Sequence, residues 1–158
     1  MGEAPYFEGY IRNSFIKPPV RVYVLIYKMS LVICYVSHEE MAAEKKRIKT
    51  RMKTAHISWM ERPEFLRAEL IEYGARFARM DKKAALAQSE NNREISYADI
   101  EKIRYSHASE DCDGEMNILC LGRLMIKTAQ STITILHNLE ESAPQEQELR
   151  RGLRQIDT

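Results

Sequence analysis

The most apolar stretch of the chain runs from Val20 to Val36 and reads VRVYVLIYKMSLVICYV. It contains two charged residues and is shorter than a membrane-spanning helix, which needs about 20 apolar residues. Its many Val, Ile and Tyr residues favour strands. Its most polar point, Lys28-Met29-Ser30, indicates a turn. We therefore predict two strands here, over Val20–Tyr27 and Leu31–Val36.

Strand patterns also occur before and far after this stretch. We expect strands over Tyr6–Ile11, from Ile100 onward, and over Met116–Leu121, Leu124–Thr128 and Thr132–His137. The last two are separated by three residues, and a connection this short makes them antiparallel neighbours. A closing helix is predicted from Pro144, with one apolar face. That face carries Leu149, Leu153 and Ile156 at i, i+4 and i+7.

The region between the two sets of strands, residues 38–91, has helical periodicity instead. Its first apolar stripe repeats at spacings of seven, four, three and four: Met41, Ile48, Met52, Ala55 and Trp59. Pro63 suits the first turn of a second helix. The second stripe contains Leu66, Leu70, Tyr73, Phe77 and Met80. These patterns predict an antiparallel helical hairpin with arms roughly 30 Å long, followed by a polar loop over residues 88–92.

Short segments outside this region resemble one family. ISYADIEKI over residues 95–103 and GRLMIKT over residues 122–128 are similar to segments of PH-like and GRAM-like domains of bacteria and archaea. VYV at 22–24 followed by LVI at 31–33 looks like their hairpin, although the Thr and Arg expected there are replaced within Leu25–Ser30. Residues 149–156 match their closing helix.

This resemblance implies an α+β fold. A PH-like bent antiparallel β-barrel or sandwich of seven strands would be formed by residues 1–158 as a single domain. The helical hairpin of residues 38–91 would interrupt it, and the C-terminal helix would cap an open end. PH-like domains are mostly non-enzymatic modules that bind lipids, peptides or proteins, and the fold alone does not choose among these partners.

Composition narrows the class of protein. The 158 residues include 24 Lys and Arg against 23 Asp and Glu, giving a formal net charge of +1. This balance excludes a disordered chain and a wholly basic nucleic-acid binder. Three cysteines without a CxxC pair favour a reducing compartment. The N-terminus has no signal-peptide pattern. We expect a cytoplasmic protein, with peripheral contact to a membrane as an alternative.

The first predicted helix has a strongly basic segment over residues 44–54. Six cationic residues fall within nine positions: Lys45, Lys46, Arg47, Lys49, Arg51 and Lys53. Such a face is most often solvated, but it also suits an anionic membrane, a nucleic acid or an acidic protein. Nucleic acid is the weaker alternative because Trp59 is the single aromatic residue of this helix, and base stacking uses several.

The apolar stripes of the hairpin have two possible destinations. They exceed what two helices alone can shield, and exposed apolar surface usually binds a partner. We expect a symmetric homodimer with a four-helix arrangement, formed by Met41, Ile48, Met52, Trp59, Leu66, Leu70 and Phe77. The alternative is that the parent sheet covers both stripes.

Patterns typical of catalysis or cofactor binding are weak. Asp111, Asp113 and Glu115 surround Gly114 but do not match a calcium loop. The four histidines form no HExxH or i, i+4 pair. A nucleophilic group of Ser96 or Ser106 with His107 and Asp99 has no supporting motif. We therefore expect no enzyme activity, metal or cofactor.

Overall fold

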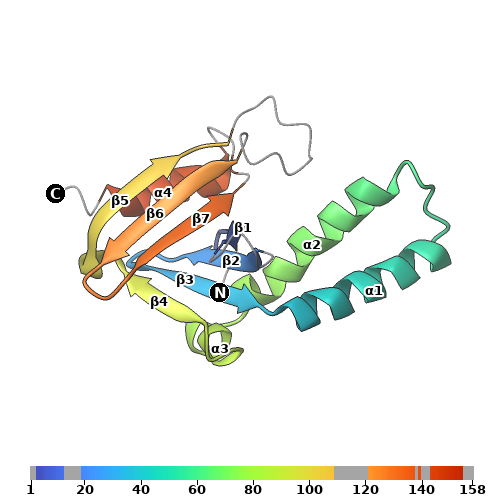
Figure 1. Ribbon diagram of the computed structural model, residues 1–158, viewed down its shortest axis with the longest axis horizontal. Helices are drawn as coiled ribbons and strands as arrows, with labels where there is room; N and C mark the ends of the chain where they lie inside the picture. Colours follow the sequence, from blue (N-terminus) through green and yellow to red (C-terminus); the bar gives the residue numbers. More distant parts are fainter. Residues whose placement is uncertain (1–2, 13–18, 109–120, 138, 140–142, 155–158) are drawn as a thin grey trace.

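The computed structural model of the protein describes residues 3–12, 19–108, 121–137, 139 and 143–154. Within these residues the fold is α+β, with seven strands and four α-helices (Figure 1). The strands are β1 (Tyr6–Ile11), β2 (Val20–Ile26), β3 (Ser30–Val36), β4 (Arg93–Ser96), β5 (Ile100–Ser106), β6 (Gly122–Thr128) and β7 (Thr132–His137). The helices are α1 (His38–Thr54), α2 (Arg62–Arg79), α3 (Lys82–Ala87) and α4 (Pro144–Leu153).

All seven strands belong to one antiparallel sheet in the order β4-β3-β2-β1-β7-β6-β5. β1 joins its two halves because it pairs with β2 on one side and with β7 on the other. At this junction Gly9 lies opposite His137, and a β-carbon on Gly9 would stand 2.7 Å from the carbonyl oxygen of Leu136. Segments on both sides of the helical region therefore form one curled sheet, as the sequence predicts.

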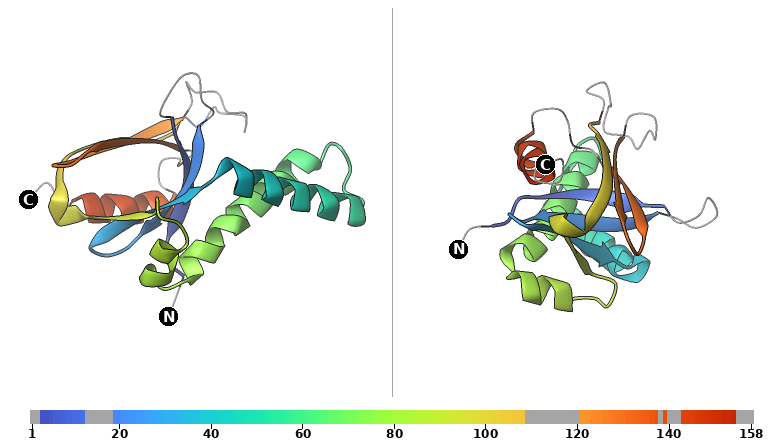
Figure 2. Two further views of the ribbon diagram at one scale, coloured as in Figure 1. Left: turned by 60° about the horizontal axis from the view of Figure 1, so that its bottom comes forward. Right: turned by 90° about the vertical axis from the view of Figure 1, so that its left-hand side faces the viewer.

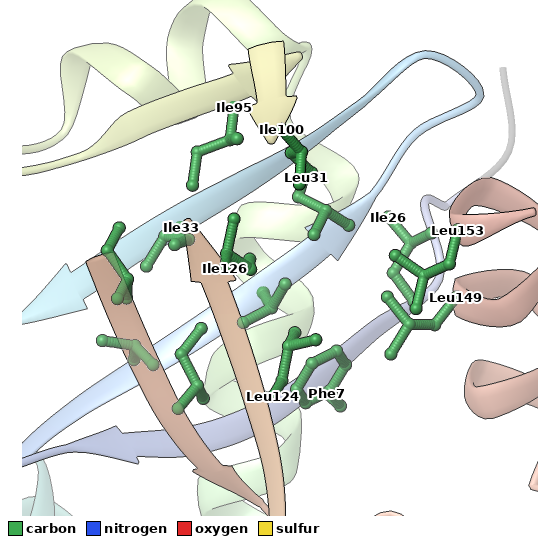
Figure 3. Close-up of a cluster of buried hydrophobic side chains, with 14 of the residues drawn as sticks. Phe7, Ile26, Leu31, Ile33, Ile95, Ile100, Leu124, Ile126, Leu149 and Leu153 are labelled. Atoms are coloured by element: carbon green, nitrogen blue, oxygen red, sulfur yellow. The ribbon is translucent and has the colours of Figure 1, made fainter. Parts of the chain in front are cut away.

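The sheet bends until it is nearly closed (Figure 2). β4 and β5, at its two edges, are connected directly by the short 3-10 helix Tyr97–Asp99. Arg93 of β4 also donates a hydrogen bond of 3.2 Å to the Ser131 hydroxyl in the β6–β7 turn. Inside the curve, side chains from the strands pack together with Leu149 and Leu153 of α4 (Figure 3). The predicted closing helix therefore covers this core, since its apolar face is buried against it.

A second apolar cluster lies between the outer face of β2 and β3 and the helices α1, α2 and α3. It contains Tyr23, Leu25, Val32, Cys34 and Val36 from the strands. This explains the unbroken apolar run in the sequence, because strands covered on both faces do not alternate with polar residues. Burial raises the pKa of the Cys34 thiol to about 12, so this thiol stays protonated and unreactive.

Two short elements differ from the sequence expectations. α3 occupies part of the region expected as the end of the hairpin, and β4 extends the sheet beyond β3. Asn92 joins both of them to the sheet. Its side chain accepts a hydrogen bond from Tyr35 N–H at 2.7 Å and donates one to the Ala85 carbonyl at 2.9 Å. Neither element has a periodic pattern long enough to identify.

Several sequence predictions fall outside the described residues. These are the acidic turn at Asp111, Asp113 and Glu115, the cysteines Cys112 and Cys120, the expected strand at Met116–Leu121 apart from its last residue, and Ile156 of the closing helix. Among the helices that the structure does describe, none combines the length and apolar character required to cross a bilayer.

Candidate interaction surface

The hairpin of α1 and α2 projects from the curled sheet, with its tip far from the barrel (Figures 1 and 2). α1 starts where Ser37 caps it, because the Ser37 hydroxyl accepts a hydrogen bond from Glu40 N–H at 3.1 Å. Pro63 stands in the first turn of α2, where its missing N–H costs nothing. The predicted helix, proline-containing connection and second helix are all present.

The base of the hairpin is fixed to the sheet by aromatic side chains. The buried Tyr23 hydroxyl of β2 donates a hydrogen bond of 2.7 Å to the Leu70 carbonyl in α2. The ring of Tyr23 packs against Tyr73 and Phe77, with ring centres 5.9 and 5.8 Å apart. Tyr6 of β1 also donates a 3.1 Å hydrogen bond to the Ile71 carbonyl. The arm is therefore held rigidly at its root.

The structure buries most of the side chains that the sequence assigns to self-association. Met41, Ile48, Met52, Leu70 and Phe77 all lie in the cluster shared with β2 and β3, at 8% exposure or less. Leu66 is half-buried against the same cluster. These stripes are covered within one chain. The four-helix interface predicted from these side chains therefore lacks the exposed apolar faces it requires, and self-association itself stays a prediction.

Trp59 is not part of the α1 stripe, which is a correction to the sequence prediction. α1 ends at Thr54, and His56 follows it with a positive φ of 53°, which turns the chain away from the helix. The spacing of four from Ala55 to Trp59 therefore has no helical meaning. Trp59 instead lies at the hairpin tip and is 78% exposed, beside Met60 at 73%.

The six predicted basic residues all lie on α1 and are exposed, but they divide into two groups. Arg47 pairs with Glu44 at 3.2 Å on its own helix, and Arg51 pairs with Glu69 across the hairpin. Within the described part of the chain, no ion pair involves the other four. These are Lys45, Lys46, Lys49 and Lys53, here called the lysine row.

The lysine row follows from helix periodicity. Lys45, Lys49 and Lys53 are spaced by four and so lie above one another on one side of α1. At 1.5 Å per residue the row is about 12 Å long. Arg47 and Arg51 lie on the other side of the buried Ile48 from the lysine row. Their carboxylate partners, Glu44 and Glu69, lie on that side too. The sequence identifies the six basic residues but does not separate Arg51 from the lysines, because its partner Glu69 lies on the other helix.

A second group of polar residues, not identified from the sequence, lies where α4 packs against β5 and β7. His137 of β7 is fully buried and stacks on Tyr105 with ring centres 5.3 Å apart. The Tyr105 hydroxyl donates to the buried Glu146 carboxylate, which also pairs with Arg150 at 3.0 Å. Loss of hydration lowers the pKa of His137 to about 4. This group ties α4 to the sheet.

The position of His137 has a sequence signal. It follows Ile133 and Ile135 at a spacing of two, so it shares the inner face of β7 with them. The nucleophilic group of Asp99 and His107 considered from the sequence is not brought together. Asp99 precedes β5 and His107 follows it, and a strand of this length separates them by roughly 20 Å. No cluster of three His, Cys, Asp or Glu suited to a metal exists among the residues with described positions.

Surface hollows exist beside the helices. One of about 190 Å³ lies between α2 and β1 and is lined in part by Tyr6, Arg67 and Ile71. Another of about 440 Å³ lies against α4 beside Lys28, Glu148 and Arg151. Neither contains the lysine row or the hairpin tip, so the most distinctive exposed chemistry is on the projecting arm.

Comparison of the chain with protein-family models, with curated proteins and with solved structures finds no match.

Proposed function

We propose that the protein is a non-enzymatic binding module of PH-like type, and that its helical hairpin is an arm that binds an anionic partner. The nearly closed seven-stranded sheet with a C-terminal helix over its core supports the PH-like part of the proposal. In this proposal the sheet is the rigid body, and the insertion between β3 and β4 supplies the binding surface.

The observation that carries the proposal is the lysine row. Four exposed cations lie within nine residues of one helix and have no ion-pair partner among the described residues. Their mutual repulsion is unfavourable in the isolated chain. An anionic surface removes that repulsion and gains attraction in its place. Tyr23 and its neighbours fix the arm, so the row is presented without a folding step.

Self-association through the hairpin is the weaker proposal. Most of the apolar side chains that would form a four-helix interface are occupied within the chain. The large apolar side chains that the hairpin leaves exposed are Trp59 and Met60 at the tip and Ile71 on α2, with part of Leu66. Light scattering tests it directly, since a dimer has twice the 18.4 kDa mass of one chain.

Retention on a sulfated-polysaccharide resin tests the anionic-partner proposal. The test variant replaces the lysine row with glutamine (K45Q/K46Q/K49Q/K53Q). The matched control removes four exposed cations from β5 and β6 (K102Q/R104Q/R123Q/K127Q). Both variants lose four charges from a net charge of +1. We expect the test variant alone to elute at much lower salt. Equal elution of the two variants would contradict a specific role for the arm.

A further inference from the structure

The hairpin tip presents apolar surface where a soluble protein rarely places it. Trp59 and Met60 are adjacent, and each is more than 70% exposed. The other exposed large apolar residues of the described chain are less exposed, Met29 at 61% in the β2–β3 turn and Ile71 at 43% within α2. A paired Trp and Met at the end of a projecting arm therefore needs an explanation beyond ordinary surface composition.

The tip is held in one shape by its own backbone. The Ser58 carbonyl accepts hydrogen bonds from the N–H groups of Glu61 at 3.0 Å and Arg62 at 3.1 Å. Trp59 and Met60 are the two residues enclosed by this turn. Because this turn is already formed in the unbound protein, binding through these two side chains requires little further ordering of the backbone.

We propose that the hairpin is a peripheral membrane anchor for an anionic bilayer. Trp59 and Met60 enter the headgroup region, and the lysine row binds the anionic lipid head groups beside them. This inference rests on the proposed function and names its anionic partner. It differs from an amphipathic helix lying on a membrane, because the apolar face of α1 is already buried against the protein.

The size of the tip favours a bilayer over a second protein chain. A fully buried Trp covers roughly 150–250 Å², whereas a stable protein interface needs about 800 Å² from each partner. Two side chains fall well short of that area. They suit a membrane interface, where Trp is enriched because its ring is apolar and its N–H remains able to bond with water or head groups.

The placement of the lysine row supports the same partner. Lys53 is six residues before Trp59 in sequence, and the row extends about 12 Å back from it along the helix. The screening length at physiological salt is about 8 Å. A hairpin tilted toward the membrane plane therefore brings the whole row within range of the lipid charges. Each lysine near the surface is expected to raise binding about fivefold, which corresponds to about 1 kcal/mol.

Trp59 provides the test directly, because it is the single tryptophan of the chain. The full chain is mixed with vesicles of phosphatidylcholine alone or with about a third phosphatidylserine, at low and at physiological salt. We expect a blue shift of its fluorescence and protection from iodide quenching with the vesicles that contain phosphatidylserine, and neither effect with phosphatidylcholine vesicles. Quenching by lipids brominated on their acyl chains reports insertion rather than surface adsorption. An unchanged spectrum with both vesicle types overturns the proposal.

Co-sedimentation with the same vesicles divides the two contributions. The lysine-row variant K45Q/K46Q/K49Q/K53Q is expected to lose more than a hundredfold in binding, and W59S/M60S roughly tenfold or more. The control K102Q/R104Q/R123Q/K127Q should bind nearly as well as the unaltered protein. Equal losses for the two four-charge variants overturn the assignment to the hairpin.

Other outcomes separate this inference from the proposed function. If the chain binds the sulfated resin through the lysine row but no vesicle, the membrane anchor is wrong and the anionic-partner function stands. If neither is bound, both are wrong. Salt-sensitive retardation of DNA or RNA without vesicle binding assigns the row to nucleic acid and overturns the anchor.

Discussion

Gly74 of α2 packs directly against the ring of Tyr23 in β2, at a distance that excludes any larger residue. A β-carbon on Gly74 would stand 2.3 Å from Tyr23 Cδ1 and 3.0 Å from Tyr6 Cε2. Tyr23 is fully buried and its ring packs against Tyr73 and Phe77, so these neighbours hold it in place. This contact sets how closely α2 approaches the sheet, and therefore the direction in which the whole arm projects.

The first prediction is that Gly74→Ala destabilises the protein. Alanine is the better helix former by about 1 kcal/mol, so the substitution would stabilise α2 if there were room. Overpacking of a close-packed contact costs about 1–3 kcal/mol, and the same contact involves the sheet. We expect the free energy of unfolding in urea to fall. Ala68→Gly on the exposed face of α2 is the control, since it loses helix propensity alone; a rise in stability for Gly74→Ala would contradict the contact.

A second prediction concerns the hydrogen bond from Tyr23 to the Leu70 carbonyl. Tyr23→Phe keeps the ring and removes the 2.7 Å bond, and we expect a loss of about 1 kcal/mol in the free energy of unfolding. Hydrogen exchange of the α2 amides should also accelerate, because the helix is less firmly attached. Tyr73→Phe provides the matched control in the same aromatic cluster, since no hydrogen bond of its hydroxyl is seen among the described residues. Equal effects of the two substitutions would contradict the role of the Tyr23 bond.

A third prediction is acid sensitivity caused by His137. Its pKa falls from an ordinary 6.5 to about 4 because burial removes the hydration of the charged ring. The groups facing it include Glu146, which opposes this shift, and His107, which adds to it. The unfolded chain therefore binds a proton before the folded one does, and stability is lost as the pH falls from about 6.5 through 4. The loss at pH 5 is about 2 kcal/mol.

Denaturant titrations at a series of pH values measure this dependence. His137→Gln removes the titrating group, so its stability should change less between pH 7 and 5 even if it is lower overall. His38→Gln alters an exposed histidine and should retain the full acid-induced loss. If the slope against pH is the same with and without His137, the assignment is wrong.

Much of the sheet can be predicted because its strands have clear periodicity and turns. Ile133, Ile135 and His137 alternate along β7, and the Ala129–Ser131 connection fixes its neighbour β6. β4 is harder to identify, since four residues are too few to establish alternation. Its place beside β3 depends on contacts such as the hydrogen bond from Tyr35 N–H to the Asn92 side chain. These contacts join residues that are distant in sequence and form only when the chain folds.

The hairpin shows a different limit. The stripe through Met41, Ile48 and Met52 predicts a buried helix face correctly, but the same pattern results whether a second chain or the parent sheet covers it. The choice depends on Tyr23 and the outer face of β2, which are distant in sequence. The spacing of the stripe also extends to Trp59, although the helix has already ended at Thr54. No glycine or proline in the sequence indicates that end, which is followed by the positive φ of His56.

The final prediction tests this division between the root and the tip of the arm. Phe77→Ala removes a ring packed against Tyr23 and Tyr73 and should reduce the free energy of unfolding by about 3–5 kcal/mol. Trp59→Ala removes a larger ring that is 78% exposed, and the change should stay within about 0.5 kcal/mol. Urea unfolding followed by circular dichroism measures both without depending on tryptophan fluorescence. A large loss for Trp59→Ala would mean that the tip packs within the protein, and the arm would then have no free apolar end to insert into a bilayer.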